Sequence, residues 1–268
     1  MKEKRFSTPR GDICYWRGEC RGGPALVFLP GLTADHRLFE KQLSYFGTRY
    51  DVLVWDAPGH GASRPFRLDF TLMDKARWLH GILEAEGIRR PVLIGQSMGG
   101  YVSQCFLQAY PGEAAGFVSI DSAPIQRQYV TALEILLLRH MYPVYRLYPW
   151  EALKKAGAEG CATTEFGRSL MRCFLESYDR EEYCRLSAHG MRILADAMAA
   201  NPPFAIDCPA LLICGTEDRA GSARRYNRNW ARRTGLPIRW IEGAGHNANT
   251  DRPDEVNRLI RDFVAGLV

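Results

Sequence analysis

The sequence predicts an α/β fold in which a mostly parallel, twisted sheet is flanked by helices and carries an inserted helical cap. Short apolar runs bounded by Gly and Pro alternate with segments of helical period, which is typical of βαβ units. Between residues 123 and 203 this alternation stops and the pattern is helical throughout. A chain of 268 residues is long enough for one such domain with an insertion. We therefore predict a core of residues 1–122 and 204–268 and a helical cap insertion at 123–203.

Six short apolar runs are the candidates for the parallel strands. They lie at residues 25–29, 52–55, 92–94, 117–120, 211–214 and 238–241. Ahead of them, residues 5–8 and 13–17 flank the turn-forming sequence Pro9-Arg10-Gly11-Asp12. This spacing predicts an antiparallel hairpin at the edge of the sheet.

Helical periods lie between the strands and within the insertion. In residues 71–86, Leu72, Ala76, Leu79 and Leu83 recur at steps of three and four, and Gly87 is expected to end that helix. A C-terminal helix is predicted over residues 253–267. The insertion carries candidate helices at 129–140, 164–178 and 181–200, because a block of this length is too long for a simple loop.

Composition excludes several classes of protein. Hydrophobic residues make up 46% and charged residues 24%, as in ordinary globular domains, and no apolar run approaches the ~18 residues of a membrane span. The basic N-terminus has no apolar stretch behind it, so we expect no secretory signal and a cytoplasmic protein. The sequence does not indicate an oligomeric state.

Cysteines and basic residues give no sign of a metal, a disulfide or a nucleic acid. The eight cysteines form no CxxC pair and no Cys/His metal spacing, so reduced thiols and no metal site are expected. The net charge is only +5, and the basic residues gather at helical spacing, which favours a solvated helix face over a nucleic-acid footprint. That set is Arg224, Arg225, Arg228, Arg232 and Arg233.

A GxSxG sequence stands where a buried strand run meets a helical segment. Residues 92–94 enter Gly95-Gln96-Ser97-Met98-Gly99, and an apolar helical stretch follows at 101–109. At such a turn the serine is held in a strained conformation that lifts its hydroxyl out of the sheet, and the glycines avoid collisions with the tight backbone. Ser97 is therefore a candidate nucleophile, which needs a base within hydrogen-bond reach.

His246 is the candidate base. In this arrangement the chain order is serine, acid, histidine. Of six histidines only His140, His189 and His246 follow Ser97, and the first two fall inside the predicted cap. His246 lies just after the last predicted strand, in a loop that can bring its imidazole over the sheet.

Asp218 is the favoured acid to orient that histidine. It closes the sequence Gly215-Thr216-Glu217-Asp218 directly after the strand at 211–214, at the edge of the sheet where sites of α/β proteins collect. Glu217 is its neighbour, and Asp121 follows an earlier strand, so both compete for the role. Asp121 is the stronger alternative and stays open at this point.

Five ordered motifs together resemble the α/β-hydrolase family, serine hydrolases with a helical cap. They are Leu29-Pro30-Gly31-Leu32, Asp56-Ala57-Pro58-Gly59-His60-Gly61-Ala62-Ser63, Gly95-Gln96-Ser97-Met98-Gly99-Gly100, Gly215-Thr216-Glu217-Asp218 and Gly243-Ala244-Gly245-His246. The resemblance implies an oxyanion hole formed by the backbone N–H groups of Leu32 and Met98, and no cofactor or metal.

Two further histidines lie in or near these motifs. His60 precedes Ser97, so the chain order favours a structural role in which it holds its own loop by hydrogen bonds. His36 follows the Leu32 loop and is a candidate substrate contact.

The expected function is that of a serine esterase. The resemblance implies cleavage of a small apolar carboxylic ester through an acyl-enzyme, with a small-molecule substrate and neither nucleic acid nor membrane as a partner. The Leu- and Tyr-rich insertion is expected to roof the substrate pocket with apolar surface. The same triad serves C–C bond hydrolases, thioesterases, lactonases, perhydrolases and lyases, and a non-catalytic ligand-binding homologue is a further alternative.

Overall fold

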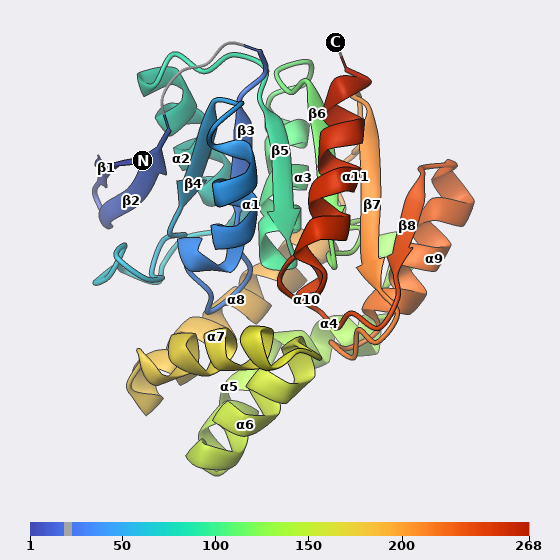
Figure 1. Cartoon of the computed structure of the whole chain (residues 1–268). Helices are drawn as coiled ribbons and strands as arrows, with labels where there is room; N and C mark the ends of the chain where they lie inside the picture. The colour runs from blue at the N-terminus through green and yellow to red at the C-terminus, as the bar shows by residue number, and fades with distance from the viewer. Residues whose placement is uncertain (19–22, 268) are drawn as a thin grey trace.

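The computed structural model describes residues 1–18 and 23–267, and its strands there form one eight-stranded sheet (Figure 1). The order across the sheet is β1-β2-β4-β3-β5-β6-β7-β8. The strands are β1 (Lys2–Thr8), β2 (Gly11–Arg17), β3 (Leu26–Leu29), β4 (Val52–Trp55), β5 (Val92–Gln96), β6 (Gly116–Ile120), β7 (Ala210–Gly215) and β8 (Ile238–Ile241). All neighbours from β4 to β8 pair in parallel, whereas β1 pairs antiparallel with β2 and β2 with β4.

The predicted mostly parallel sheet and its edge hairpin are confirmed, with small differences at strand ends. β5 continues to Gln96 because Gly95 and Gln96 still pair with Ser119 and Ile120 of β6. The hairpin strands begin earlier than predicted, at Lys2 and Gly11. The strands of an edge hairpin pair through backbone hydrogen bonds, which continue where the side chains are polar. A strand length predicted from apolar residues is therefore too short.

Helices cover both faces of the sheet because alternate strand residues point to opposite sides. Val27 and Leu29 of β3 pack with α2 (Leu72–Ala85), α3 (Met98–Ala109) and α9 (Ala223–Thr234). Leu26 and Phe28 pack instead with α1 (Glu40–Phe46) and α11 (Pro253–Ala265), which lie together in front of the sheet in Figure 1. The parallel strands β3 to β7 are thus buried on both faces, whereas the edge strand β8 is partly exposed.

The chain between β6 and β7 is helical and lies beyond the carboxyl ends of the parallel strands (Figure 1). Its elements are η2 (Arg127–Tyr129), α4 (Ala132–Arg139), α5 (Met141–Leu147), α6 (Trp150–Cys161), α7 (Glu165–Glu176) and α8 (Arg180–Ala200). The helices predicted at 164–178 and 181–200 correspond to α7 and α8. The helix predicted at 129–140 begins later, because Thr131 and Glu134 form a capping box.

Helices α5 and α6 have no counterpart among the predicted elements. Pro143 and Pro149 interrupt the pattern there, and prolines argue against a helix when only the sequence is read. In the structure Pro143 falls in the first turn of α5 and Pro149 is the N-cap of α6. A proline is tolerated at the start of a helix, where its missing N–H would have no partner in any case.

The described residues bear on two features of the composition, membrane-spanning helices and cysteines. No helix among them has the length and apolar character needed to cross a membrane. Seven cysteines are described, and all are free thiols. Cys20, like the rest of 19–22 and residue 268, lies outside the described residues.

Candidate active site

Ser97 occupies a strained turn between β5 and α3. Its backbone has φ 48° and ψ −116°, a region that residues with a side chain rarely adopt. The surrounding packing leaves no room for side chains at the neighbouring glycines: a Cβ on Gly99 would lie 1.9 Å from the carbonyl oxygen of Leu29. One on Gly95 would lie 2.5 Å from the backbone of Gly99 and Gly100. The glycines of the motif therefore allow the turn that exposes the serine hydroxyl.

We expect Gly99→Ala to destabilise the fold by about 2–3 kcal/mol, because the added methyl must displace the backbone of β3. Urea unfolding measures the change. Gly160→Ala in α6 is the matched control, since a Cβ there meets no heavy atom within 4 Å and should stabilise the helix by up to ~1 kcal/mol. An unchanged unfolding midpoint for Gly99→Ala would contradict this packing.

The structure brings the three predicted site residues into one hydrogen-bonded chain. His246 Nε2 lies 2.8 Å from the Ser97 Oγ, and His246 Nδ1 lies 3.0 Å from the Asp218 Oδ2. The Asp218 side chain is 0% exposed and that of His246 12%. Because Nδ1–H donates to the carboxylate, Nε2 is free to accept the hydroxyl proton of Ser97. The arrangement can activate the serine as a nucleophile.

The carboxylate of Asp218 raises the pKa of the buried His246 imidazole. Burial alone would lower the pKa of His246, but the charge and the hydrogen bond of Asp218 outweigh it and raise that pKa above its ordinary value. The other carboxylate oxygen of Asp218 accepts the backbone N–H of Ala220 at 2.8 Å, which fixes its orientation. Asp218 therefore favours the charged form of the His246 imidazole.

Asp121, the competing acid, lies beside this chain and is bonded to backbone amides. Its Oδ1 accepts the N–H of Gly215 at 2.7 Å and its Oδ2 the N–H of Ala248 at 2.8 Å. Burial, followed by the negative charge of Asp218, raises the pKa of Asp121 well above its ordinary value. One carboxyl group thus clamps the loop that carries Asp218 to the loop that carries His246.

Three polar residues that the sequence analysis did not single out hold the His246 loop in place. Gln96 Nε2 donates to the His246 carbonyl oxygen at 2.8 Å and to Asn247 Oδ1 at 3.0 Å. Asp251 Oδ2 accepts the N–H of Gly245 at 2.8 Å. Gln96 stands inside the GxSxG motif, between the buried strand and Ser97. A carboxamide at this position is the sequence signal that could have pointed to it. Asn247 and Asp251 carry no sequence signal. The partner of Asn247 is Gln96, 151 residues away, and Asp251 also accepts the N–H of Thr163, 88 residues away.

A cavity of about 470 Å³ opens at Ser97 and His246. Leu32 and Met98 line it as well, and no backbone carbonyl of the described residues accepts a hydrogen bond from either amide. Much of the remaining wall is apolar and comes from the helices between β6 and β7. This set includes Val130, Leu137, Leu138, Met141, Met191, Leu194 and Met198. The cavity can therefore hold an apolar group next to the serine hydroxyl.

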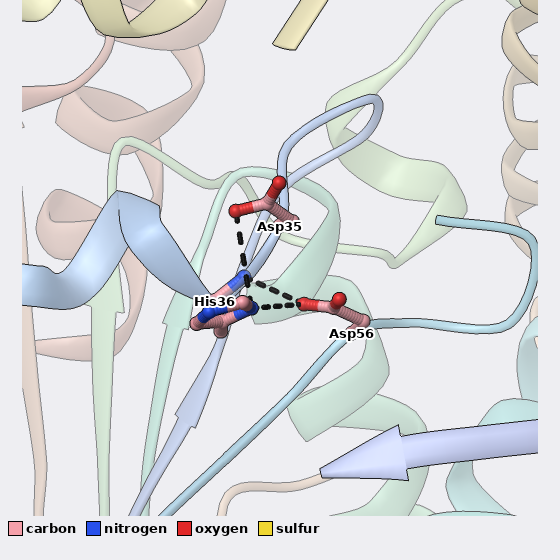
Figure 2. Close-up of side chains that lie close together, drawn as sticks. All are labelled: Asp35, His36 and Asp56. Atoms are coloured by element: carbon pink, nitrogen blue, oxygen red, sulfur yellow. Dashed lines mark hydrogen bonds and ion pairs between the residues drawn. The ribbon is translucent and has the colours of Figure 1, made fainter. Parts of the chain in front are cut away.

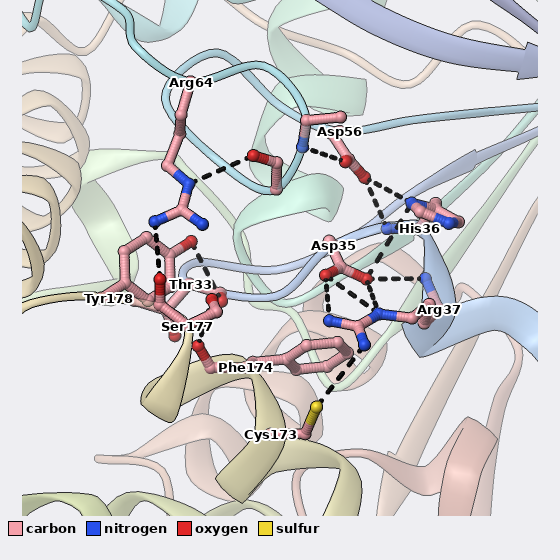
Figure 3. Close-up of polar contacts among 12 residues, drawn as sticks. Thr33, Asp35, His36, Arg37, Asp56, Arg64, Cys173, Phe174, Ser177 and Tyr178 are labelled. Atoms are coloured by element: carbon pink, nitrogen blue, oxygen red, sulfur yellow. Dashed lines mark hydrogen bonds and ion pairs between the residues drawn. The ribbon is translucent and has the colours of Figure 1, made fainter.

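Hydrogen bonds join these helices to the loops of the core (Figure 3). The Tyr178 hydroxyl donates to the Thr33 carbonyl oxygen at 3.3 Å. Arg64 donates to the Ser177 carbonyl oxygen at 3.0 Å and pairs with Glu182, also at 3.0 Å. Tyr178 thereby anchors the segment between α7 and α8 to the loop after β3, which contains Leu32, and Arg64 anchors this segment and the start of α8 to the loop after β4.

The two other histidines singled out in the sequence hold loops in place: His36 contacts β2 and the loop after β4, and His60 contacts its own loop. His36 Nδ1 lies 2.9 Å from Asp56 Oδ1 (Figure 2). The His36 ring also packs on Trp16, with ring centroids 3.7 Å apart. His36 is not among the described residues that line the cavity, so the expected substrate contact gains no support. His60 is buried with Nδ1 3.0 Å from the Pro58 carbonyl oxygen, and burial lowers its pKa to about 3.

Two groups of potential metal ligands occur among the described residues, Asp35 with His36 and Asp56, and Asp121 with Cys214 and Asp218. Their carboxylates already have partners. Asp35 Oδ2 pairs with Arg37 at 2.7 Å, and Asp56 Oδ1 accepts the His36 N–H at 2.7 Å (Figures 2 and 3). In the second group both acids bind backbone amides. In both groups the acidic side chains therefore hold loops in place through these contacts.

Known proteins share the sequence pattern and the fold. The sequence model of the alpha/beta hydrolase family matches residues 26–259. The chain is 25% identical over 269 residues to the uncharacterized hydrolase YugF of Bacillus subtilis, covering 97% of each. A thermophilic esterase from Thermogutta terrifontis superposes with a TM-score of 0.76 at 22% identity, over 100% of this chain and 99% of that one. The enol-lactonase from Burkholderia xenovorans gives 0.77 at 22% identity, over 98% and 100%.

Proposed function

Because the chain belongs to the alpha/beta hydrolase family, we propose that it is a serine hydrolase that cleaves a small apolar carboxylic ester through an acyl-enzyme. The observation that carries the proposal is the hydrogen-bonded series Ser97, His246 and Asp218 at the floor of an apolar cavity. The esterase and the enol-lactonase with the same fold act on ester bonds of their own substrates, as their names state, which supports this reaction class.

In the proposed reaction Ser97 attacks the ester carbonyl while His246 accepts the hydroxyl proton. The backbone N–H groups of Leu32 and Met98 stabilise the developing oxyanion, and each such donor contributes about 3 kcal/mol to lowering the barrier. His246 then returns the proton to the departing alcohol, and Asp218 stabilises the imidazolium in between. Water then attacks the acyl carbonyl while His246 accepts its proton. His246 returns this proton to the Ser97 oxygen as the bond to the acyl group breaks, which releases the acid and restores the serine hydroxyl.

We also propose that the helical segment at 123–203 acts as a cap that selects the acyl group. Its methionines and leucines line one side of the cavity, whose volume of about 470 Å³ suits a small substrate. Burying the acyl chain against these side chains supplies binding energy in proportion to the area removed from water.

A series of p-nitrophenyl esters of increasing acyl length tests this function. Each buried methylene contributes about 0.8 kcal/mol, so kcat/KM should rise by up to about fourfold per carbon until the cavity is full and then fall. Initial rates of p-nitrophenol release measure it.

The two contrary outcomes have different meanings. A flat profile would place the acyl chain in solvent and remove the selecting role of the cap. Negligible turnover of every ester, with Ser97 still reactive toward an electrophilic probe, would instead favour a C–C bond hydrolase or a lyase.

A further inference from the structure

A second hollow, of about 620 Å³, adjoins the Ser97 cavity and is lined by four arginines. We call it the arginine cleft, and its lining residues are Asp218, Arg219, Gly221, Ser222, Arg224, Arg225 and Arg228. Gly221 and Ser222 also line the Ser97 cavity, so the two spaces meet there. Three of the five arginines that the sequence places on a solvated helix face line this cleft.

The positive charge of the arginine cleft is only partly neutralised by the protein. Arg225 pairs with Glu134 at 2.6 Å. Arg224 donates to the Thr216 carbonyl oxygen at 2.6 Å, and the Arg228 guanidinium lies 5.7 Å from the Trp240 ring centroid. Among the described residues, no carboxylate lies within 4.0 Å of a side-chain nitrogen of Arg224 or Arg228.

The one acidic residue that lines the cleft does not offset this charge. The Asp218 side chain is 0% exposed, and its carboxylate is directed to His246 and the Ala220 N–H. Two guanidinium groups without carboxylate partners therefore face a cleft whose acidic lining residue points away. Guanidinium groups bind carboxylate and phosphate through paired N–H donors, which makes an anion the matching ligand.

The short segment Gly221-Ser222, which lines both spaces, separates the cleft from the cavity. At Gly221 there is no side chain, and a Cβ placed on it would meet no heavy atom within 4 Å. Ser222, the second shared residue, is small. A single extended molecule can therefore reach from the apolar wall of the cavity, past Ser97, into the arginine cleft.

We propose that the substrate is an acyl ester whose leaving group carries a phosphate or carboxylate, and that this anionic group binds in the arginine cleft while the apolar acyl group fills the Ser97 cavity. The inference rests on the proposed hydrolase function and names the substrate class of that site. Because the anion lies on the leaving-group side, the apolar character proposed above then describes the acyl group and not the whole ester.

Three butyryl esters with related phenolic leaving groups test the proposal. They are 4-butyryloxybenzoate, 4-butyryloxyphenyl phosphate and the neutral methyl 4-butyryloxybenzoate, so the first two distinguish a carboxylate from a phosphate. The measured quantity is the ratio of kcat/KM for each anionic ester to that for the neutral ester. Differences in leaving-group reactivity cancel when this ratio is compared between protein variants.

The informative variant combines Arg224→Gln with Arg228→Gln. The matched control combines Arg232→Gln with Arg258→Gln, which removes the same charge from exposed positions that do not line the cleft. The cleft variant loses two solvent-exposed ion pairs with the substrate, which should lower its ratio by about tenfold. The control should keep the wild-type ratio. Equal losses in both variants would indicate general attraction by net charge, and no loss in either would leave the cleft without a ligand; each of these results overturns the proposal.

Binding to the Ser97→Ala protein separates this inference from the proposed function. Calorimetric titration with the three intact esters does not depend on turnover. Tighter binding of an anionic ester, lost on adding Arg224→Gln and Arg228→Gln, supports the cleft even if no ester is hydrolysed by the wild-type protein. Equal affinity for the neutral and both anionic esters overturns the inference and leaves the hydrolase proposal to its own tests.

Discussion

Replacing Ser97 with alanine is expected to abolish labelling of the protein by a fluorophosphonate probe, and to reduce ester hydrolysis to background. The reagent reacts readily only with a serine whose proton is accepted by a nearby base. Ser97 meets this condition, since its hydroxyl lies 2.8 Å from His246 Nε2. In-gel detection of the probe, followed by mass spectrometry of the labelled peptide, measures the effect.

Ser122→Ala is the matched control for this experiment. Ser122 also lines the Ser97 cavity, but none of the described hydrogen bonds links its hydroxyl to a histidine. Its alanine variant should label as the wild type does. Labelling at a serine other than Ser97, or no labelling of the wild-type protein, would remove the hydrolase proposal and favour a ligand-binding homologue.

Asp218→Asn is expected to lower kcat by up to about 10⁴-fold while leaving the protein folded. The carboxamide can donate to His246 Nδ1, which stabilises the tautomer whose Nε2 carries a proton and cannot accept one from Ser97. Asp121→Asn should lower kcat much less. It replaces one of two accepting oxygens by an NH₂ group that faces a backbone N–H, so its main effect should be a stability loss of about 1–3 kcal/mol.

The pH dependence of activity compares Asp218→Asn with Asp121→Asn in a second way. Since Asp218 raises the pKa of His246, the imidazole of the wild-type protein stays protonated, and inactive as a base, to a higher pH than an ordinary histidine. Activity should therefore fall as pH decreases through this raised pKa. Removing the charge in Asp218→Asn should move that acidic limb to lower pH. If Asp121→Asn produced the larger loss of kcat and the larger shift, Asp121 would be the orienting acid.

The order of elements could be predicted from the sequence because the local pattern carries it. Buried parallel strands appear in the sequence as apolar runs. The tight turn at the nucleophile requires glycine at fixed positions, so it can be recognised as GxSxG. The same local reading missed α5 and α6, because their prolines interrupt the pattern yet occupy helix starts in the structure. Propensity is a weak guide wherever tertiary contacts determine which residue begins a helix.

Ser97 and His246 could be proposed from the sequence because motif and chain order left few candidates. The sequence favoured Asp218 but left Asp121 open, since each follows a strand. Only the tertiary structure decides which carboxylate faces the imidazole: it directs Asp218 to His246 and Asp121 to the amides of Gly215 and Ala248. The arginine cleft is likewise a product of folding, because its charge depends on which guanidinium groups the folded chain leaves without a carboxylate partner. Spacing along a chain determines which residues share a strand or a helix face, whereas hydrogen-bond partners between distant segments are set by how the elements pack.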